Sequence, residues 1–191
     1  MPYSSVLGKD WIRVKVEAHR GEIAEVLDVG AGSGTYAKLL RSAVLPDSHF
    51  TAVEVWEPYV AQFRLWQQYD AVLVGNALEV EVPDKTYDLA IFGDVLEHVA
   101  PSEAIWMVER FAWRYAVLSL PVTEYPQGAY MGNHHEAHVA TWSAKDVRNV
   151  WGDLVKDQMT YPGDTGLGEV EEAIGVFWLE WKNRKTQGSS R

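Results

Sequence analysis

One short stretch, residues 25–36, constrains the fold of this chain more than any other. It reads Glu-Val-Leu-Asp-Val-Gly-Ala-Gly-Ser-Gly-Thr-Tyr, so an apolar strand-like run leads directly into Gly30, Gly32 and Gly34, and a helical pattern begins at once. Glycines let a backbone turn sharply and approach a ligand without a Cβ clash. The amide groups at a helix start add partial positive charge. The stretch therefore predicts a strand–turn–helix unit with a ligand site at its turn.

The rest of the chain repeats this alternation of apolar β-type runs and helical patterns, which is typical of βα units around a parallel sheet. The opening segment Asp10–His19 fits both a helix and a strand, and we favour the helix. Pro58 opens a helix on which Tyr59, Phe63 and Trp66 share one face, and Ser102 is expected to cap the helix that follows it. Strands are predicted at Ile23–Val29, Phe50–Val55, Ala71–Val74, Tyr87–Phe92, Tyr115–Leu120, Leu154–Thr160 and Gly175–Trp181, with further helices at Gly34–Ala43 and Ser143–Val150.

The chain of 191 residues has no repeat and no linker, so we expect a single domain over residues 1–191. Residues 1–22 form its N-terminal helix segment, and residues 183–191 read as a flexible tail. The absence of cysteine excludes disulfides, thiolate metal sites and cysteine nucleophiles. A net charge of −10 argues against binding of long nucleic acid. No signal peptide or membrane-spanning run is visible, so we expect a cytoplasmic location.

The spacing of the glycines separates two kinds of nucleotide-derived ligand. Dinucleotide sites use G-x-G-x-x-G, with the pyrophosphate on the helix end. Here the spacing is G-x-G-x-G, and Thr35 stands where the third glycine would fall. Asp28, two residues before the first glycine, would repel a pyrophosphate but suits a cationic ligand. A nicotinamide-dependent dehydrogenase is therefore disfavoured.

This stretch resembles motif I of the class I S-adenosylmethionine-dependent methyltransferases, and the resemblance extends through most of the chain. It implies a three-layer α/β sandwich, with helices on both faces of a seven-stranded, mostly parallel sheet of order 3-2-1-4-5-7-6 whose last strand is antiparallel. In that family an acidic residue ending the second strand holds the ribose hydroxyls, and Glu54 has this place. Val55 would lie against the adenine, and Asn76 would accept from the adenine amino group through its side-chain oxygen.

These features follow successive predicted strands, where open α/β sheets bind their ligands. A glycine turn or a terminal carboxylate alone would be weak evidence, but their order along the chain favours a cofactor site over coincidence. The resemblance implies that S-adenosylmethionine is held by Asp28, Gly30, Ala31, Gly32, Gly34, Glu54, Val55, Asn76, Ala77, Gly93 and Asp94.

The segment after the fourth strand resembles the part of the family fold beside the reacting methyl group. Asp94, His98 and His138 are the residues we expect to act in catalysis. Together with Glu97 they also resemble the Glu-x-x-Glu-His and later histidine of metal-using relatives, namely the small-RNA 3′-terminal 2′-O-methyltransferases and the ubiquinone-pathway O-methyltransferases. Many metal-free relatives carry the same residues, so whether they bind a divalent metal stays open, and packing is the favoured interpretation.

The long connection from Pro121 to Trp142 has no periodicity, and long loops of this kind are usually functional or disordered. It carries three of the histidines, and we expect it to select the methyl acceptor. His134 and His135 are expected to be solvent-exposed. Trp142 would line a pocket, whereas Trp66, Trp106, Trp178 and Trp181 would belong to the core.

The acceptor is expected to be the oxygen or nitrogen of a small molecule or of an accessible chain end. The Asp/Asn-Pro-Pro-Tyr/Phe motif of amino-methylating DNA enzymes is absent, and so is the cysteine of the cytosine-C5 enzymes. Two alternatives stay open. One is an RNA 3′-end 2′-O-methyltransferase, and the other is a non-catalytic S-adenosylmethionine-binding subunit that supports a partner.

Overall fold

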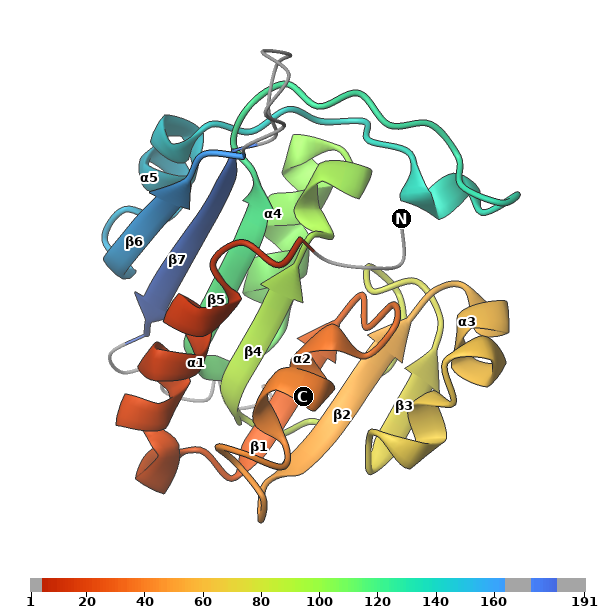
Figure 1. The fold of residues 1–191 in the computed structure, drawn as a ribbon, viewed down its shortest axis with the longest axis vertical. Helices are drawn as coiled ribbons and strands as arrows, with labels where there is room; N and C mark the ends of the chain where they lie inside the picture. The colour runs from red at the N-terminus through yellow and green to blue at the C-terminus, as the bar shows by residue number, and fades with distance from the viewer. Residues whose placement is uncertain (1–4, 164–172, 182–191) are drawn as a thin grey trace, which may run out of the picture.

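The computed structural model describes residues 5–163 and 173–181, and these form an α/β sandwich (Figure 1). A seven-stranded sheet has the order β3-β2-β1-β4-β5-β7-β6, which confirms the predicted fold class and topology. The strands are β1 (Glu25–Val29), β2 (His49–Glu54), β3 (Ala71–Val74), β4 (Tyr87–Gly93), β5 (Trp113–Pro121), β6 (Val155–Tyr161) and β7 (Ile174–Glu180). The first five are parallel, and β7 runs antiparallel to both β5 and β6.

Helices cover both faces of the sheet. The α-helices are α1 (Lys9–Ala18), α2 (Thr35–Leu40), α3 (Glu57–Gln62), α4 (Pro101–Arg110) and α5 (Ala144–Trp151), and the short 3-10 turns are η1 (Arg20–Glu22), η2 (Leu65–Gln67), η3 (Leu96–His98) and η4 (His134–Glu136). Alternate residues of the strands point to opposite faces. Val26 therefore belongs to the core cluster that includes residues of α1 and α2, whereas Leu27 belongs to the cluster that includes residues of α4 and α5. The helix preferred for Asp10–His19 is confirmed as α1.

The register of the parallel strands brings their carboxyl ends together at one edge. Val29 is paired with Val53 on β2 and with Phe92 on β4, and Glu54 is paired with Val74 on β3. The turns after β1, β2, β3 and β4 are therefore neighbours, although they lie up to about sixty positions apart in the chain. None of the helices in the described ranges is long and apolar enough to cross a membrane.

Three local predictions are wrong. Helix α4 begins with Pro101 after the N-cap Ala100, and Ser102 lies inside its first turn; the fixed φ of proline suits the first helical position. Helix α3 ends at Gln62, and Arg64 has a left-handed φ of 52°, so Trp66 is carried onto the separate turn η2 and is 56% exposed. Trp106 faces outward from α4 and is also 56% exposed.

The other predicted core tryptophans pack inside the described structure. Trp178 is buried in β7, and Trp181 packs partly buried against the cluster around α4 and α5. The predicted tail, residues 183–191, lies outside the described residues.

Candidate cofactor and methyl-transfer site

A cavity of about 820 Å³, including its open mouth, lies at the carboxyl edge of the sheet. Most of the residues predicted to hold the cofactor line it. These are Gly30, Ala31, Gly32, Glu54, Val55, Asn76, Ala77, Gly93 and Asp94, and His98 from the predicted catalytic set joins them.

Glu54 is the most firmly held polar group of this cavity. Its side chain is buried, and its two carboxylate oxygens accept hydrogen bonds from different backbone amides, Oε1 from Trp56 N and Oε2 from Gly32 N, each at 2.8 Å. Burial raises the pKa of Glu54, and these amides oppose the rise. A carboxylate oxygen has a second lone pair, so the group can still accept from neighbouring hydroxyls.

The first glycine of the turn is needed for two reasons. Gly30 has a φ of 77°, and a Cβ there would lie 2.8 Å from the side chain of Val95. The backbone N–H groups of Gly30 and Ala31 both donate to the carbonyl oxygen of Val53, at 2.9 and 3.2 Å. The turn is thereby fastened to β2, next to Glu54.

Asn76 also lines the cavity, after β3. Its side-chain oxygen accepts from the backbone N–H of Leu78 at 2.9 Å, so it closes the turn as well as facing the cavity. The predicted contact with an adenine amino group would use the second lone pair of that oxygen.

Two predicted cofactor residues lie outside the lining. Asp28 is buried beneath the turn, where its Oδ2 accepts from the Tyr69 hydroxyl at 2.5 Å. Burial raises the pKa of Asp28 to about 7. Gly34 faces the side chain of Gln68, whose Oε1 would lie 2.2 Å from an added Cβ. Both residues support the shape of the turn instead of facing the cavity.

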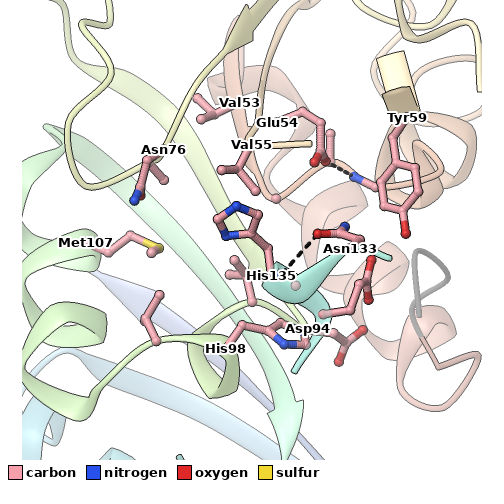
Figure 2. Close-up of a pocket in the computed structure, with 18 of the residues that line it drawn as sticks. Val53, Glu54, Val55, Tyr59, Asn76, Asp94, His98, Met107, Asn133 and His135 are labelled. Atoms are coloured by element: carbon pink, nitrogen blue, oxygen red, sulfur yellow. Dashed lines mark hydrogen bonds between the residues drawn. The ribbon is translucent and has the colours of Figure 1, made fainter. Parts of the chain in front are cut away.

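Asp94 and His98 lie together at one end of the cavity, whereas Met107 lies on the side of Asn76 (Figure 2). Asp94 has a left-handed φ of 52°, which is uncommon for a residue other than glycine and is frequent at functional sites. The Nζ of Lys9 lies 3.6 Å from its Oδ2. No motif or periodicity had indicated this lysine.

The structure brings Glu97, His98 and His138 together, with one possible ligand atom from each within 4.8 Å of the others. Nδ1 of His98 lies 3.2 Å from the carbonyl oxygen of Ala137, and Nδ1 of His138 lies 2.7 Å from that of Tyr125. Because a carbonyl only accepts, each Nδ1 carries the proton and each Nε2 keeps its lone pair. Burial lowers the pKa of both histidines, which favours the neutral, ligating form.

Asp94 is outside this three-residue group and is paired with Lys9 instead. An ammonium beside the carboxylate is a poor environment for a divalent cation, because like charges repel. Three of the four residues considered as metal ligands, Glu97, His98 and His138, are therefore grouped closely enough to hold an ion.

The covering loop, residues 122–142, crosses the carboxyl edge of the sheet from β5 toward α3 and returns to α5 (Figure 1). Its Asn133, His135 and Glu136 line the same cavity as Glu54. Both His134 and His135 are exposed, as expected. His135 also lines the cavity, and Figure 2 shows its ring pointing toward Val55, a role that the sequence did not indicate.

The loop is held by hydrogen bonds within itself and by hydrogen bonds to the turn after β4. Asn133 is buried, and its side-chain oxygen accepts from His135 N at 3.0 Å. The carbonyl oxygen of Glu97 accepts from the N–H groups of both Val139 and Ala140. Trp142 is 4% exposed and stacks on the ring of Trp151, so it belongs to the core and does not line the cavity.

Sequence reasoning missed five residues of this region. Tyr59 and Met107 point into the cavity from α3 and α4, and Asn133 and Glu136 come from the covering loop. Lys9 comes from α1. The position of Tyr59 directly after Pro58, at the start of the helix that follows Glu54, could have indicated it. For the other four, the sequence pattern contains no comparable signal.

Comparisons with known proteins agree with this geometry. Residues 27–112 match the sequence model of a methyltransferase domain family, a range that runs from β1 through α4. No curated protein sequence matches the chain significantly.

Solved structures superpose over nearly the whole chain. The small RNA methyltransferase HEN1 does so with a TM-score of 0.64 and 17% identity, over 95% of this chain but only 26% of that one. The 1,6-didemethyltoxoflavin-N1-methyltransferase of Burkholderia thailandensis gives 0.64 and 18%, over 93% and 79% of the two chains. The magnesium protoporphyrin IX methyltransferase of Synechocystis PCC 6803 gives 0.64 and 16%, over 91% and 82%. At such identities the superpositions establish a shared fold.

Proposed function

We propose that this chain is a class I S-adenosylmethionine-dependent methyltransferase, and that it methylates an oxygen or nitrogen of a small molecule or of an accessible chain end. The observation that supports this proposal most strongly is the position of the Glu54 carboxylate. Its buried carboxylate is fixed by two backbone amides at the wall of a cavity, beside the glycine-rich turn. A fixed acceptor of this kind suits the paired hydroxyls of a ribose.

The donor set of the cavity fits S-adenosylmethionine better than a dinucleotide. Glu54, Glu136 and Asp94 all line it, and Glu136 adds to the rise in the pKa of Glu54. Such a wall opposes a pyrophosphate and suits a ligand that carries an ammonium and a sulfonium. When bound, S-adenosylmethionine supplies an electrophilic methyl group on its sulfonium.

The residues at the reaction end contribute alignment and proton removal. Asp94, Val95 and Val99 line the cavity beside His98, and the covering loop adds Asn133, His135 and Glu136 to the lining. Methyl transfer depends on in-line alignment and the exclusion of water. The Nε2 of His98 keeps its lone pair, so without a metal this nitrogen is the candidate to take the proton from a hydroxyl or ammonium acceptor. A metal bound to Nε2 would replace this role.

Calorimetry tests the cofactor assignment. We expect S-adenosylhomocysteine to bind and NAD not to bind. Glu54→Ala should weaken binding by about 1.5 to 3 kcal/mol, the range for hydrogen bonds to a charged group. Glu124→Ala, which removes an exposed carboxylate of the covering loop, is the matched control and should have no effect. Binding of NAD without any response to S-adenosylhomocysteine would overturn the proposal.

We further propose that methyl transfer by this protein requires a bound divalent metal. Two imidazoles and one carboxylate, from His98, His138 and Glu97, form a donor set that suits Mn²⁺ or Zn²⁺ better than Mg²⁺. A bound divalent metal would supply Lewis acidity to an acceptor hydroxyl. The hydrogen bonds from the Nδ1 atoms to carbonyls are the supports that ligating histidines usually have.

Metal binding can be measured without any acceptor. We expect Mn²⁺ to bind the wild-type protein in equilibrium dialysis, His138→Ala to abolish binding, and His134→Ala, at an exposed position of the same loop, to leave it intact. EDTA should then remove activity. Activity unchanged in EDTA would exclude the metal and leave the methyltransferase assignment in place.

An RNA 3′ end is the second candidate acceptor. It is favoured by the three-residue group and by the likeness to small RNA methyltransferase HEN1, although this chain spans about a quarter of that chain. Methyl transfer to a short RNA with a free terminal 2′-hydroxyl, and none to the same RNA with that hydroxyl blocked, would establish it.

The non-catalytic alternative predicts a different pattern of results. A subunit that only supports a partner would bind S-adenosylhomocysteine but transfer no methyl group to small-molecule or RNA acceptors. The polar reaction end formed by Asp94 and His98 favours catalysis.

A further inference from the structure

A buried lysine lies behind the reaction end of the cavity. Lys9, the first residue of α1, is only 8% exposed, and lysines are rarely buried unless they are paired. Its Nζ donates to the hydroxyl oxygen of Tyr36 at 2.7 Å and to that of Ser119 at 3.3 Å, and lies 3.6 Å from Oδ2 of Asp94. The ammonium thus has three oxygens around it, from α2, β5 and the turn after β4.

The partners of Lys9 are themselves fixed. The ring of Tyr36 packs against the backbone of Gly93, where a Cβ would lie 2.0 Å from a ring atom. Burial raises the pKa of Tyr36 to about 12, so its hydroxyl stays protonated and accepts from Lys9 as a neutral group. The backbone N–H of Asp94 donates to the carbonyl oxygen of Ser119 at 2.6 Å.

The positive charge of Lys9 is balanced by the negative charge of Asp94. Burial lowers the pKa of Lys9, but Tyr36 and Asp94 together raise it above its ordinary value, so the side chain is an ammonium. Asp94 is the member of the cluster that lines the cavity, and its left-handed backbone makes its direction depend on outside support.

We propose that Lys9 is a positioning residue, which holds the Asp94 carboxylate in the direction that the cofactor requires. The inference rests on the proposed function, since it assigns Asp94 to the cofactor. It connects α1, which contributes nothing to the cavity lining, to the end of the cavity where the methyl group is transferred. In this role the effect of Lys9 on binding is transmitted entirely through Asp94.

A buried ion pair can also serve only to fasten a helix. A double-mutant cycle separates the two roles, because residues that act through one another give non-additive effects. The variants are Lys9→Gln, Asp94→Asn and the double substitution, and the measurement is the Kd for S-adenosylhomocysteine by calorimetry, with Tm recorded for each. Glutamine keeps donors for Tyr36 and Ser119 while removing the charge.

We expect Lys9→Gln to raise the Kd about tenfold, and Asp94→Asn to raise it at least as much. In the double variant the Kd should stay within about twofold of that for Asp94→Asn alone. Lys9→Arg, which keeps the charge, should recover most of the affinity. Lys15→Gln is the control on the same helix, since Lys15 pairs with Asp157 away from the cavity, and should leave the Kd unchanged.

Two results would overturn the inference. One is a tenfold effect of Lys9→Gln that persists in the Asp94→Asn background, which would make Lys9 act independently of Asp94. The other is a lower Tm of Lys9→Gln with an unchanged Kd, which would show that Lys9 only stabilises the packing of α1. A wild-type protein that fails to bind S-adenosylhomocysteine would contradict the proposed function itself, and the inference with it.

Discussion

The cavity is built by two regions that are held in place in different ways. The strand ends, which carry Gly30, Glu54 and Asn76, are fixed by the register of the parallel sheet. The covering loop reaches the same cavity with Asn133 and His135, but it lies outside the sheet. Its position depends on hydrogen bonds within the loop and on hydrogen bonds with Glu97, His98 and Ala173. The two regions therefore line one cavity, but only the strand ends are held by strand pairing.

A pair of glycines gives the largest contrast between the regions. Gly30→Ala combines left-handed strain with a clash against Val95, and should lower the free energy of unfolding by about 2 to 5 kcal/mol. Gly132, in the covering loop, has a φ of 85° but open space around it, so Gly132→Ala should cost only about 1 to 2 kcal/mol. Urea unfolding measures both. Equal losses would mean that the two regions are equally rigid.

The second prediction concerns Asp28, which supports the strand ends from below. Its pKa is about 7 in the folded protein, against 3.8 as the ordinary value. Between about pH 4 and 7 the native state therefore holds a proton that the unfolded state has released, so stability falls as pH rises, by at most about 1.4 kcal/mol per pH unit. Asp28→Asn should flatten this fall in urea unfolding across that range. The same slope in both proteins would assign the pH dependence to other groups.

The two histidines of the covering loop should differ in their effect on the cofactor. His135 points into the cavity, so His135→Ala should weaken S-adenosylhomocysteine binding by about 0.5 to 1.5 kcal/mol, the range for a lost aromatic contact. His138 does not line the cavity, and His138→Ala should change cofactor affinity by less than about 0.5 kcal/mol while lowering kcat/KM for the acceptor. Calorimetry and steady-state kinetics check the two parts. A loop that serves the acceptor alone would leave both affinities unchanged.

The smallest effects are expected at two of the four tryptophans that the sequence pattern assigned to the core. Trp66 and Trp106 are each 56% exposed, so replacement by Ala should change the free energy of unfolding by no more than about 0.5 kcal/mol. A loss of several kcal/mol at either site, measured by urea unfolding, would show that the side chain packs more deeply in solution.

The sequence predicted the strand ends well because their signals are local and repeat along the chain. An apolar run followed by glycine or a carboxylate indicates both a strand and the edge where it ends, and Glu54 lies where that logic placed it. The prediction that Trp66 is a core residue was wrong because it extended the helical period past Arg64, whose left-handed backbone ends the helical pattern. Such a reversal has no marker when the residue is not glycine.

The covering loop and α1 were harder to predict, because their roles depend on contacts between distant residues. Lys9 donates a hydrogen bond to Ser119, which lies more than a hundred positions away in the chain, and no short sequence pattern can predict such a contact. His98 and His138 were predicted as neighbours through the resemblance, and the structure places their ring centres 4.8 Å apart. Asp94 was considered with them as a metal ligand, an interpretation that stayed open, and in the structure it is paired with Lys9 instead.

The position of β7 has a consequence for the order in which this protein can assemble. β7 pairs with β5 on one side and with β6 on the other, so the sheet cannot be completed until residue 180 is available. During synthesis the edge of β5 that later pairs with β7 stays unpaired for some time, and exposed strand edges invite association with other chains. The half of the sheet that carries Gly30 and Glu54 needs no such wait. A nascent chain would therefore form the strand ends that carry Gly30 and Glu54 first. The pairing of β7 with β5, which covers the exposed edge and limits aggregation, would form last.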